Sequence, residues 1–354
     1  MADLIRGVTS KRWRTPMVYA IGCLLFFTVA ACRPPADDAA IRFEQLNIEP
    51  ITEQYASGRV YADISLHHVL TLPVDSDVKL FDLGPVVADT KGHIYVVDYG
   101  VDKVFRFSSN GEYVTSYGTG VGEAPGELLS ISDFGVSGNS IVYIVDSYGR
   151  KVSFYEMDGT FIRSRPVSHQ PWRYARTDGG REYTLFANHF DAELESRIED
   201  DVVAFDRFAT QPDEIGLWTG GWLNTYQEHL IYALVRFPIV LRYAPDGSMV
   251  YARTTPDYAD FEEPDVEHRM LGGTQARRVT GEILTGSPIA VENEHLFVHT
   301  NIPGGAVDVY DVGTGNYKYS MRLPVNTYTY VKNDRIYQSQ DSTVSVWAIE
   351  RPSG

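Results

Sequence analysis

A repeat of 48 residues is the sequence feature that most restricts the fold of this chain of 354 residues. Three patterns recur at that offset: a β-branched and aromatic run ending in Asp, a Lys-Val pair, and an Asn-Gly or Asp-Gly pair. The matched segments are Ile94–Asp98 with Val142–Asp146, Lys103-Val104 with Lys151-Val152, and Asn110-Gly111 with Asp158-Gly159. Self-similarity at about 40–50 residues marks a protein built from one repeated supersecondary unit. The chain is therefore expected to be an array of similar units.

Each unit is predicted to be an antiparallel meander of four strands. A strand ending in Asp is followed by a polar turn and a second strand, and an Asx-Gly hairpin turn leads to the next strand. Those next strands are expected at Tyr113–Tyr117 and Phe161–Arg165. Weaker copies of the pattern continue as far as Val344–Trp347. Stacked meanders of this size are typical of the blades of a β-propeller.

The length of the repetitive region predicts six blades, with seven as the alternative. Residues 41–350 would give about 52 residues to each of six blades, and known propellers have about four to eight blades. The early apolar segment Ala62–Leu72 is expected to supply the outer strand of the last blade. This N-terminal strand would close the ring and remove exposed sheet edges. We therefore predict an all-β, six-bladed β-propeller over residues 51–350.

Residues 1–31 have the organisation of an export signal. Residues 1–16 carry four basic side chains against one acid, and residues 17–31 form an apolar run that is short for a membrane span. The run ends in Val29-Ala30-Ala31-Cys32, which resembles the bacterial lipobox. That resemblance implies that Cys32 receives a diacylglycerol and becomes the first residue of the mature protein. An uncleaved anchor and a plain secretory signal are the alternatives.

Residues 32–50 are predicted to be a flexible tether that follows the lipidated cysteine, because they begin with prolines and small or acidic residues. The other cysteine, Cys23, would be lost with the signal, so the mature chain would have no free thiol for catalysis or metal binding. Arg33 stands where similar lipoproteins retained in the inner membrane carry an aspartate. We therefore expect an outer-membrane lipoprotein.

The charge of the chain excludes one class of partner. The full chain has a net charge of −16, and residues 32–354 carry 46 acidic and 27 basic side chains, a net charge of −19. Binding to nucleic acid needs clustered Lys and Arg that displace counterions from phosphates. We therefore expect no nucleic-acid partner.

Residues 118–128, with the sequence GTGVGEAPGEL, resemble the segment between blades in NHL-repeat propellers. Together with VYIVDSYGRKVSFYEMDGTFI at residues 142–162, they make the chain similar to bacterial six-bladed β-propeller lipoproteins. The resemblance is specific over residues 80–165 and general over residues 170–350. It implies a fold and a location more than an activity, because such propellers serve as ligand platforms, docking surfaces and occasionally enzymes.

Three aspartates are weak candidates for a metal site. Asp98 and Asp146 end equivalent predicted strands, and Asp102 follows the first of them closely. Acids repeated at one end of successive blades would line a shared channel mouth, where a hard cation such as Ca²⁺ takes six to eight oxygen ligands. We favour the other interpretation, in which each aspartate accepts backbone N–H bonds from its own turn. No cofactor is otherwise expected.

Tryptophans and a histidine near the acidic segments are the candidate ligand-binding residues. Trp218 and Trp222 stand four residues apart in a Gly-rich loop, Trp172 is expected at the start of a blade, and His189 lies beside an acidic run. Indole rings near carboxylates suit a sugar or peptide ligand, and loops on a rigid scaffold often carry binding sites. The equally weighted alternative is a local cap that packs both rings of the Gly-rich loop onto a sheet edge.

Two runs of acidic residues interrupt the repeat. Asp191–Asp201 and Asp257–Glu267 each contain six acids in 11 residues. Such runs usually form solvated loops, which is the interpretation we favour.

These features favour a binding protein over an enzyme. We expect a monomer, attached to the membrane by its lipid, that binds an envelope protein or glycan over the mouth of the central channel. The alternative is a metal-dependent hydrolase or lyase with its site at the same mouth, although no catalytic residue is assigned and no G-x-S-x-G motif occurs. A third hypothesis is a structural subunit that docks a membrane partner through Trp218 and Trp222.

Overall fold

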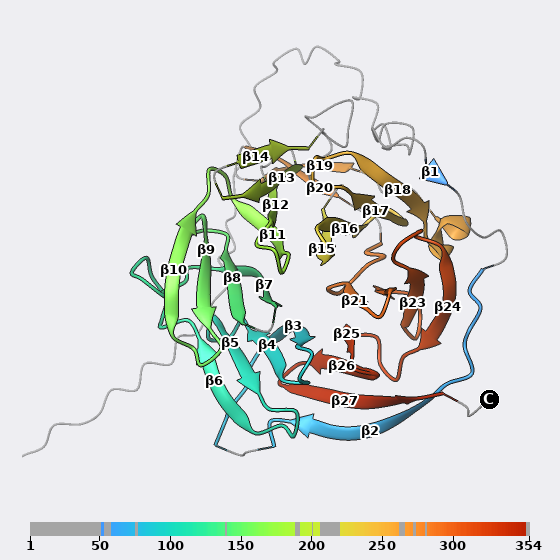
Figure 1. Ribbon diagram of the computed structural model, residues 1–354, viewed down its shortest axis with the longest axis horizontal. Helices are drawn as coiled ribbons and strands as arrows, with labels where there is room; N and C mark the ends of the chain where they lie inside the picture. The colour runs from blue at the N-terminus through green and yellow to red at the C-terminus, as the bar shows by residue number, and fades with distance from the viewer. Residues whose placement is uncertain are drawn as a thin grey trace, which may run out of the picture. The chain divides into compact units, whose positions relative to one another are not determined.

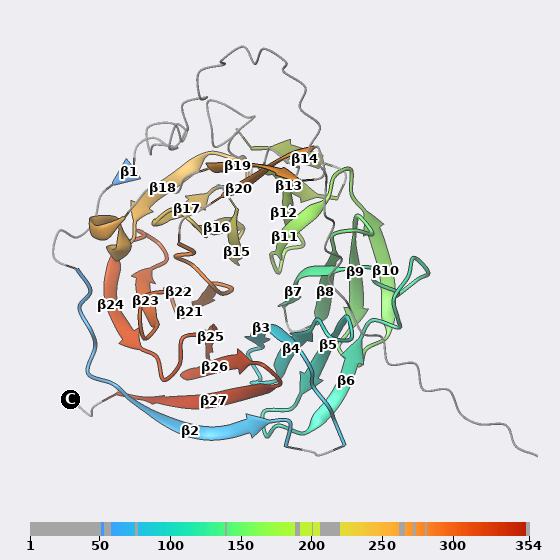
Figure 2. The ribbon, with the colours of Figure 1, turned by 180° about the vertical axis from the view of Figure 1, so that it is seen from behind.

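The computed structural model describes residues 51–52, 58–74, 77–138, 140–187, 192–199, 201–205, 220–261, 266–271, 274–279 and 282–351. All of them lie in the second of two compact units, Asp38–Gly354. They form six blades of four antiparallel strands arranged in a ring around a central channel (Figures 1 and 2). The prediction of an all-β, six-bladed propeller is confirmed. Cys32 and the rest of residues 1–50 lie outside the described part of the chain.

The first three blades follow the chain from the inner strand outward. Blade 1 contains β3 (Leu83–Ala88), β4 (Ile94–Asp98), β5 (Lys103–Phe107) and β6 (Tyr113–Tyr117). Blade 2 contains β7 (Ile131–Ser137), β8 (Ile141–Asp146), β9 (Lys151–Glu156) and β10 (Phe161–Pro166). Blade 3 contains β11 (Pro171–Arg176), β12 (Glu182–Ala187), β13 (Ala192–Ile198) and β14 (Asp201–Ala204).

The other blades have the same order, except that the last one takes its outer strand from the N-terminal region. Blade 4 contains β15 (Gly221–Tyr226), β16 (His229–Leu234), β17 (Ile239–Tyr243) and β18 (Met249–Thr254). Blade 5 contains β21 (Ala290–Glu292), β22 (His295–Thr300), β23 (Ala306–Asp311) and β24 (Tyr317–Arg322). Blade 6 contains β25 (Tyr328–Lys332), β26 (Arg335–Gln340), β27 (Thr343–Glu350) and β2 (Ser65–Leu72).

Four short elements of the described chain lie outside these 24 strands. The strand β1 (Ile51–Thr52) pairs in parallel with β18, and β19 (Val266–Leu271) pairs with β20 (Thr274–Val279) as a separate two-stranded sheet. A short 3-10 helix, η2 (Pro256–Asp260), follows β18. Within the described ranges, no helix has the length and apolar character needed to cross a membrane.

The 48-residue repeat corresponds to one blade. Asp98 is paired with Lys103 across β4 and β5, and Asp146 is paired with Lys151 across β8 and β9. The turns after β5 and β9 each contain a glycine at positive φ, +87° at Gly111 and +97° at Gly159. A residue with a side chain rarely adopts this conformation. The repeated Asx-Gly pairs therefore mark the hairpins that separate the third and fourth strands of each blade.

The prediction of a solvated loop at Asp191–Asp201 is wrong, because most of this acidic run is strand β13. Leu194 and Ser196 are buried, whereas Glu195 and Arg197 between them are partly exposed. This alternation of buried and partly exposed residues is that of a half-buried strand. In the second run, Asp257 lies in η2 and residues 266–267 begin β19, so that run is not a single loop either.

The N-terminal strand closes the ring, as predicted. The strand β2 pairs antiparallel with β27, and Leu72 packs with Val344 and Val346 in one hydrophobic cluster. The strand begins at Ser65 rather than at the expected Ala62, whose N–H donates instead to the Ser320 carbonyl of blade 5 at 2.9 Å. The two ends of the propeller are therefore joined within blade 6.

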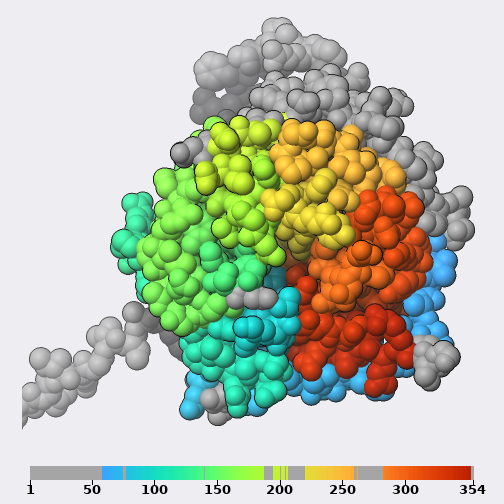
Figure 3. All heavy atoms as spheres, in the orientation of Figure 1, coloured from blue at the N-terminus to red at the C-terminus, as the bar shows by residue number. Residues whose placement is uncertain are grey.

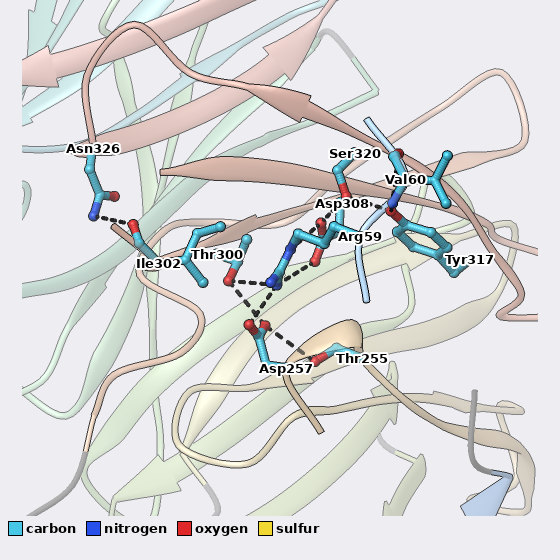
Figure 4. Close-up of polar contacts among 10 residues, drawn as sticks. All are labelled: Arg59, Val60, Thr255, Asp257, Thr300, Ile302, Asp308, Tyr317, Ser320 and Asn326. Atoms are coloured by element: carbon cyan, nitrogen blue, oxygen red, sulfur yellow. Dashed lines mark hydrogen bonds and ion pairs between the residues drawn. The ribbon is translucent and has the colours of Figure 1, made fainter. Parts of the chain in front are cut away.

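A buried arginine attaches the segment before β2 to blade 5. The Arg59 side chain lies between Asp257 and Asp308 (Figure 4), with Nη2 2.6 Å from Asp257 Oδ1 and Nε 3.0 Å from Asp308 Oδ1. Asp308 also accepts a hydrogen bond from Ser320 Oγ at 2.6 Å, and Thr300 Oγ1 accepts one from Arg59 at 3.1 Å. Burial opposes ionisation, but the two carboxylates raise the pKa of Arg59. This ion cluster fixes where the chain enters the ring.

Candidate functional site

A cavity of about 400 Å³ lies at the end of the central channel where the inner strands begin. Its wall comes from the first residues of inner strands in blades 1, 3, 4 and 6, from two turns, β4–β5 and β16–β17, and from residues 283–286 before β21. Six residues of this wall define what we call the aromatic mouth: Tyr99, Trp172, Arg173, Trp222, Arg236 and Tyr328. The ring is hollowed around its axis in the space-filling view (Figure 3). The volume falls in the range of small-molecule sites, about 300–1,000 Å³.

Two tryptophans enter the aromatic mouth from neighbouring blades. Trp172 belongs to β11 and Trp222 to β15. The Trp222 ring is 6% exposed, and its Nε1 donates to the Thr285 carbonyl at 3.2 Å, which fixes the orientation of the ring. Gly220 lies so close to Trp172 that an added Cβ would come within 2.1 Å of the indole. The glycine before β15 therefore makes room for the tryptophan of the preceding blade.

The Arg173 guanidinium lies near both indoles. Its Cζ is 3.9 Å from the centroid of the Trp222 ring and 5.2 Å from that of Trp172, both within cation–π distance. Nη1 donates to the carbonyl oxygens of Ser132 at 2.5 Å and Trp172 at 3.0 Å. Nε is buried and has no hydrogen-bond partner among the described residues. Burial lowers the pKa of Arg173, but an arginine side chain still remains charged in a protein.

One carboxylate influences this arginine from deeper in the channel. Asp133 lies on β7, where its Oδ2 accepts the N–H of Tyr174 at 2.9 Å and its Oδ1 accepts the N–H of Phe134 at 3.0 Å. Burial raises the pKa of Asp133 to about 6, although the charge of Arg173 and both N–H bonds act in the opposite direction. Asp133 and Arg173 do not form an ion pair within 4 Å in the described structure.

A second arginine, Arg236, reaches the aromatic mouth from the turn between β16 and β17. Partial burial lowers its pKa as well. Tyr99 comes from the corresponding turn of blade 1 and is 37% exposed, and Tyr328 begins β25. Among the described residues that line this cavity there are two arginines and no carboxylate. The described wall of the aromatic mouth therefore carries two cationic side chains in a protein that is acidic as a whole.

The opposite end of the channel has a different chemical character. A cavity of about 300 Å³ lies where the inner strands end, and its charged wall residues define the acidic mouth: Asp89, Asp178, Glu228 and Lys332. A smaller cavity of about 130 Å³, lined by Asp133 and Tyr330 among others, lies between the two mouths. Among the described wall residues, the acidic mouth therefore has three carboxylates and one lysine, whereas the aromatic mouth has two arginines.

The acidic mouth uses its most buried carboxylate for internal bonds. Asp89 is 3% exposed, and its Oδ1 accepts the backbone N–H groups of Lys91 and His93, each at 2.9 Å. Its Oδ2 accepts the hydroxyl of Tyr95 at 3.0 Å and lies 2.9 Å from His93 Nδ1. These four contacts satisfy most of the hydrogen-bonding capacity of the carboxylate. Asp89 is therefore part of the scaffold of the turn after β3.

The structure places two of the four predicted ligand-binding residues in the same cavity. Trp172 and Trp222 both line the aromatic mouth. Trp218 and His189 lie outside the described residues, so their roles stay predictions. Trp222 is largely buried, as the capping alternative requires, whereas Trp172 is partly exposed to the cavity. The capping alternative concerned Trp218 and Trp222 together, so it stays a prediction.

Two of the predicted metal candidates, Asp98 and Asp146, each bind two backbone N–H groups from the segment before the inner strand of their blade and one from their own turn. The carboxylate of Asp98 accepts the N–H groups of Phe81, Asp82 and Gly100 at 2.8–3.1 Å. Asp146 accepts the equivalent N–H groups of blade 2, and Asp102 has a positive φ of +50° after the blade 1 turn. Within the described ranges, no three His, Cys, Asp or Glu side chains are grouped to hold a metal ion. The turn interpretation therefore accounts for one bond of Asp98 and one of Asp146, and the other bonds attach each strand end to the start of its own blade. Calcium binding stays a prediction.

Four residues of the aromatic mouth were not predicted: Tyr99, Arg173, Arg236 and Tyr328. Arg173 directly follows Trp172, and Tyr99 directly follows the repeated Asp98. Their position in the repeat could have identified them. In a propeller, residues at the start of an inner strand, or just after the second strand of a blade, lie at one end of the channel. Arg236 and Tyr328 stand in weak copies of the repeat, where these positions cannot be assigned from the sequence.

A buried serine and histidine stand behind the aromatic mouth. Ser287 Oγ is 2.7 Å from His299 Nδ1, and His299 Nε2 is 3.1 Å from Asn326 Oδ1. Ser287 is fully buried and also accepts the N–H of Thr329 at 2.8 Å. Burial lowers the pKa of His299 to about 4, so the ring is neutral at physiological pH. Because the hydroxyl is inaccessible, this arrangement supports the strands next to the mouth instead of serving as a nucleophile.

Comparison with known proteins agrees with the fold. A family described as a 6-bladed beta-propeller matches residues 64–209, which run from the closing strand β2 to the end of blade 3. No curated protein matches the sequence. The resemblance to NHL repeats stays a prediction.

Several solved structures have a similar fold at low sequence identity. A protein from Bacteroides fragilis that is described as exported has a TM-score of 0.57 and 12% identity, over 86% of this chain and 99% of that chain. A protein of unknown function from Bacteroides thetaiotaomicron has a TM-score of 0.54 and 12% identity, over 82% and 73% of the two chains. Virginiamycin B lyase from Staphylococcus aureus has a TM-score of 0.50 and 9% identity, over 81% and 99%. At such identities the similarity shows the fold alone.

Proposed function

We propose that this six-bladed propeller is a lipid-anchored binding protein of the bacterial cell envelope, and that its ligand is a glycan bound at the aromatic mouth. The observation that carries the proposal is the cavity itself. It combines the partly exposed ring of Trp172 with Tyr99 and Tyr328 and has the volume of a small-molecule site. A pyranose ring has C–H groups that pack on an aromatic face and hydroxyl groups that form hydrogen bonds at its edge.

The rigidity of the scaffold supports a binding role. Trp172 and Trp222 stand on inner strands, and the Trp222 indole is held by its hydrogen bond to Thr285. A site built on strands is held more precisely than one built on loops. Little side-chain entropy is then lost on binding, which favours affinity.

The proposed location rests on the sequence and on one similar fold. The basic, apolar and small-residue segments that end at Cys32 favour lipidation, and a similar structure belongs to a protein described as exported. We propose attachment to the outer membrane. Replacement Cys32→Ala is expected to move the protein from the membrane fraction to the soluble fraction. Unchanged membrane fractionation would contradict the lipid anchor.

Binding is tested with the mature lipoprotein purified in detergent and applied to a glycan array, followed by calorimetry on the glycans that bind. Trp172→Ala is expected to weaken binding by roughly 30-fold or more, because aromatic anchors carry most of the energy of such sites. Trp347→Ala is the matched control, since Trp347 lies on β27 and packs against His68 of the outer strand. Equal affinities for both variants, or an array on which nothing binds, would overturn the glycan proposal.

The metal-dependent hydrolase or lyase stays an alternative prediction. Metal analysis of the purified protein separates the two hypotheses. A stoichiometric divalent ion that is lost on replacement of Asp102 would favour the enzyme, because carboxylates are the usual ligands of Ca²⁺ and Mg²⁺.

A further inference from the structure

Two consecutive residues of β11, Trp172 and Arg173, both line the aromatic mouth. Consecutive residues of a regular strand point to opposite faces of the sheet. The pairing of β11 with β12, however, shifts register between Pro171 and Arg173, which is the sign of a β-bulge. A bulge turns a side chain that would otherwise face away. One strand therefore supplies two neighbouring residues of the cavity wall.

Arg173 and Trp222 close the inner end of the aromatic mouth. They are 9% and 6% exposed, whereas Trp172 and Tyr328 are partly exposed. The Arg173 guanidinium lies 3.9 Å from the centroid of the Trp222 ring, and Nη1 donates to the Ser132 carbonyl of blade 2 at 2.5 Å. Beyond them lies the cavity of about 130 Å³, whose described wall shares only Trp222 with the aromatic mouth. We call Arg173 and Trp222 the floor of the aromatic mouth.

The sides of the aromatic mouth come from most of the ring. Blades 1, 3, 4 and 6 and the segment before blade 5 contribute the described residues Pro85, Tyr99, Trp172, Val235, Thr285 and Tyr328. A polymer that passes across a binding site needs a groove with an entrance and an exit. Walls on this many sides, together with the floor, instead make the described cavity a pocket that a ligand enters from one direction.

We infer that the aromatic mouth binds the end of a glycan chain, and that about two terminal sugar units enter it while the rest of the chain stays outside. This inference rests on the proposed function. A cavity of about 400 Å³ suits a drug-sized ligand, and a disaccharide, with about 23 non-hydrogen atoms, has that size. The terminal unit then lies against the floor, and the partly exposed ring of Trp172 packs on a sugar face.

The bonds of the floor fix the depth to which a chain can enter. Trp222 Nε1 donates to the Thr285 carbonyl, and Arg173 Nη1 donates to two backbone carbonyls. Moving either side chain would break these bonds and leave buried polar groups unsatisfied. A chain that continued through the channel would need the floor to open, whereas a chain end does not.

The test compares glycans of different length by calorimetry on the purified mature lipoprotein. The probes are malto-, isomalto-, laminari- and xylo-oligosaccharides from dimers to heptamers, and the array glycan that binds most tightly, shortened one unit at a time. In at least one series, affinity is expected to rise up to the dimer or trimer and then to stay within about twofold. A linear polysaccharide of the same linkage, with roughly 50 units, is expected to bind protein only at its ends, which the stoichiometry measures.

A variant then assigns binding to the interior of the pocket. Val235→Trp enlarges a partly buried wall residue and is expected to weaken binding of the dimer or trimer roughly 10-fold or more, because it fills part of the cavity. Val250→Trp is the matched control, since Val250 is exposed on β18, the outer strand of the same blade. Circular dichroism and melting curves confirm that both variants are folded. If Val235→Trp does not fold, the length series on the natural protein decides alone.

The outcomes separate this inference from the proposed function. If affinity rises with every unit up to the heptamer, or if the polysaccharide binds protein along its whole length, the chain lies in a groove. The inference is then overturned and glycan binding stands. The same holds if polysaccharides bind and no oligomer does, or if the two valine variants have equal affinities. If neither the array nor any oligomer or polysaccharide shows binding, the proposed function is overturned as well.

Discussion

The two mouths lie at opposite ends of the same channel but use their charged residues differently. At the acidic mouth, the buried carboxylate of Asp89 accepts bonds from the backbone and side chains of its own turn. At the aromatic mouth, Arg173 is held by indole faces and carbonyls, without a carboxylate at ion-pair distance in the described structure. The comparison shows that the buried charge of Asp89 stabilises the fold through hydrogen bonds. The guanidinium of Arg173, by contrast, contacts aromatic rings that line the cavity.

The largest effect on stability is expected at Asp89. Asp89→Ala removes the acceptor of two N–H groups and the Tyr95 hydroxyl in a site that is 3% exposed. Leaving these donors unsatisfied is expected to cost about 4 kcal/mol of the free energy of unfolding, measured by urea denaturation. Binding at the aromatic mouth should be unchanged in the folded fraction. A loss below about 1 kcal/mol, or weakened ligand binding, would break the distinction between the two mouths.

Asp133 lies between the mouths and is expected to give a pH-dependent effect of about 3 kcal/mol. Burial raises the pKa of Asp133 from 3.8 to about 6, so the folded state binds a proton more readily than the unfolded state. The contribution of this group to stability is therefore present below pH 4 and is lost as pH rises through 6.

Asp133→Asn removes the titration and should abolish that slope. Urea denaturation at a series of pH values between 4 and 7 measures the change. A variant with the same profile as the natural protein would show that folding does not raise the pKa of Asp133.

The sequence predicts the architecture well because the architecture is repeated. Asp98 and Asp146 end equivalent strands, and their carboxylates accept equivalent backbone bonds, so one copy of the pattern explains the other. Closure by β2 was also predictable, since a ring needs a last strand and Ala62–Leu72 was the apolar segment that had no place in the repeat. Short sequence patterns therefore predict the fold where successive blades repeat the same local contacts.

The site was predicted only in part because it depends on contacts between distant residues. Trp172 and Trp222 were found by residue type, but Arg173 is functionally notable only because Trp222, far away in sequence, lies against its guanidinium. In the same way, Arg59 binds Asp308 across 249 residues, and no spacing rule reveals that pair. The strand at Asp191–Asp201 was missed because its acids concealed the alternation of Leu194 and Ser196.

His299, behind the aromatic mouth, is expected to change stability with the opposite pH dependence. Burial lowers its pKa from 6.5 to about 4, so the unfolded state takes up the proton first. Stability from this group is present above pH 6.5 and is lost as pH falls through 4, by at most about 3 kcal/mol. His299→Gln should remove that loss, and denaturation between pH 4 and 7 measures it. An unchanged acid limb would contradict the buried neutral ring.

The smallest effect is expected at Lys332, and it tests whether the two mouths act independently. Lys332 Nζ donates to the Val291 carbonyl at 3.2 Å and lies 3.7 Å from Glu292 Oε1, so Lys332→Gln should cost about 1 kcal/mol or less. The change makes the acidic mouth more negative, but screening over the length of the channel should leave ligand affinity at the aromatic mouth within about twofold. Calorimetry with the glycan that binds most tightly measures this directly. A clear loss of affinity would mean that the ligand responds to the charge at both ends, and the channel would then have to be treated as one continuous site.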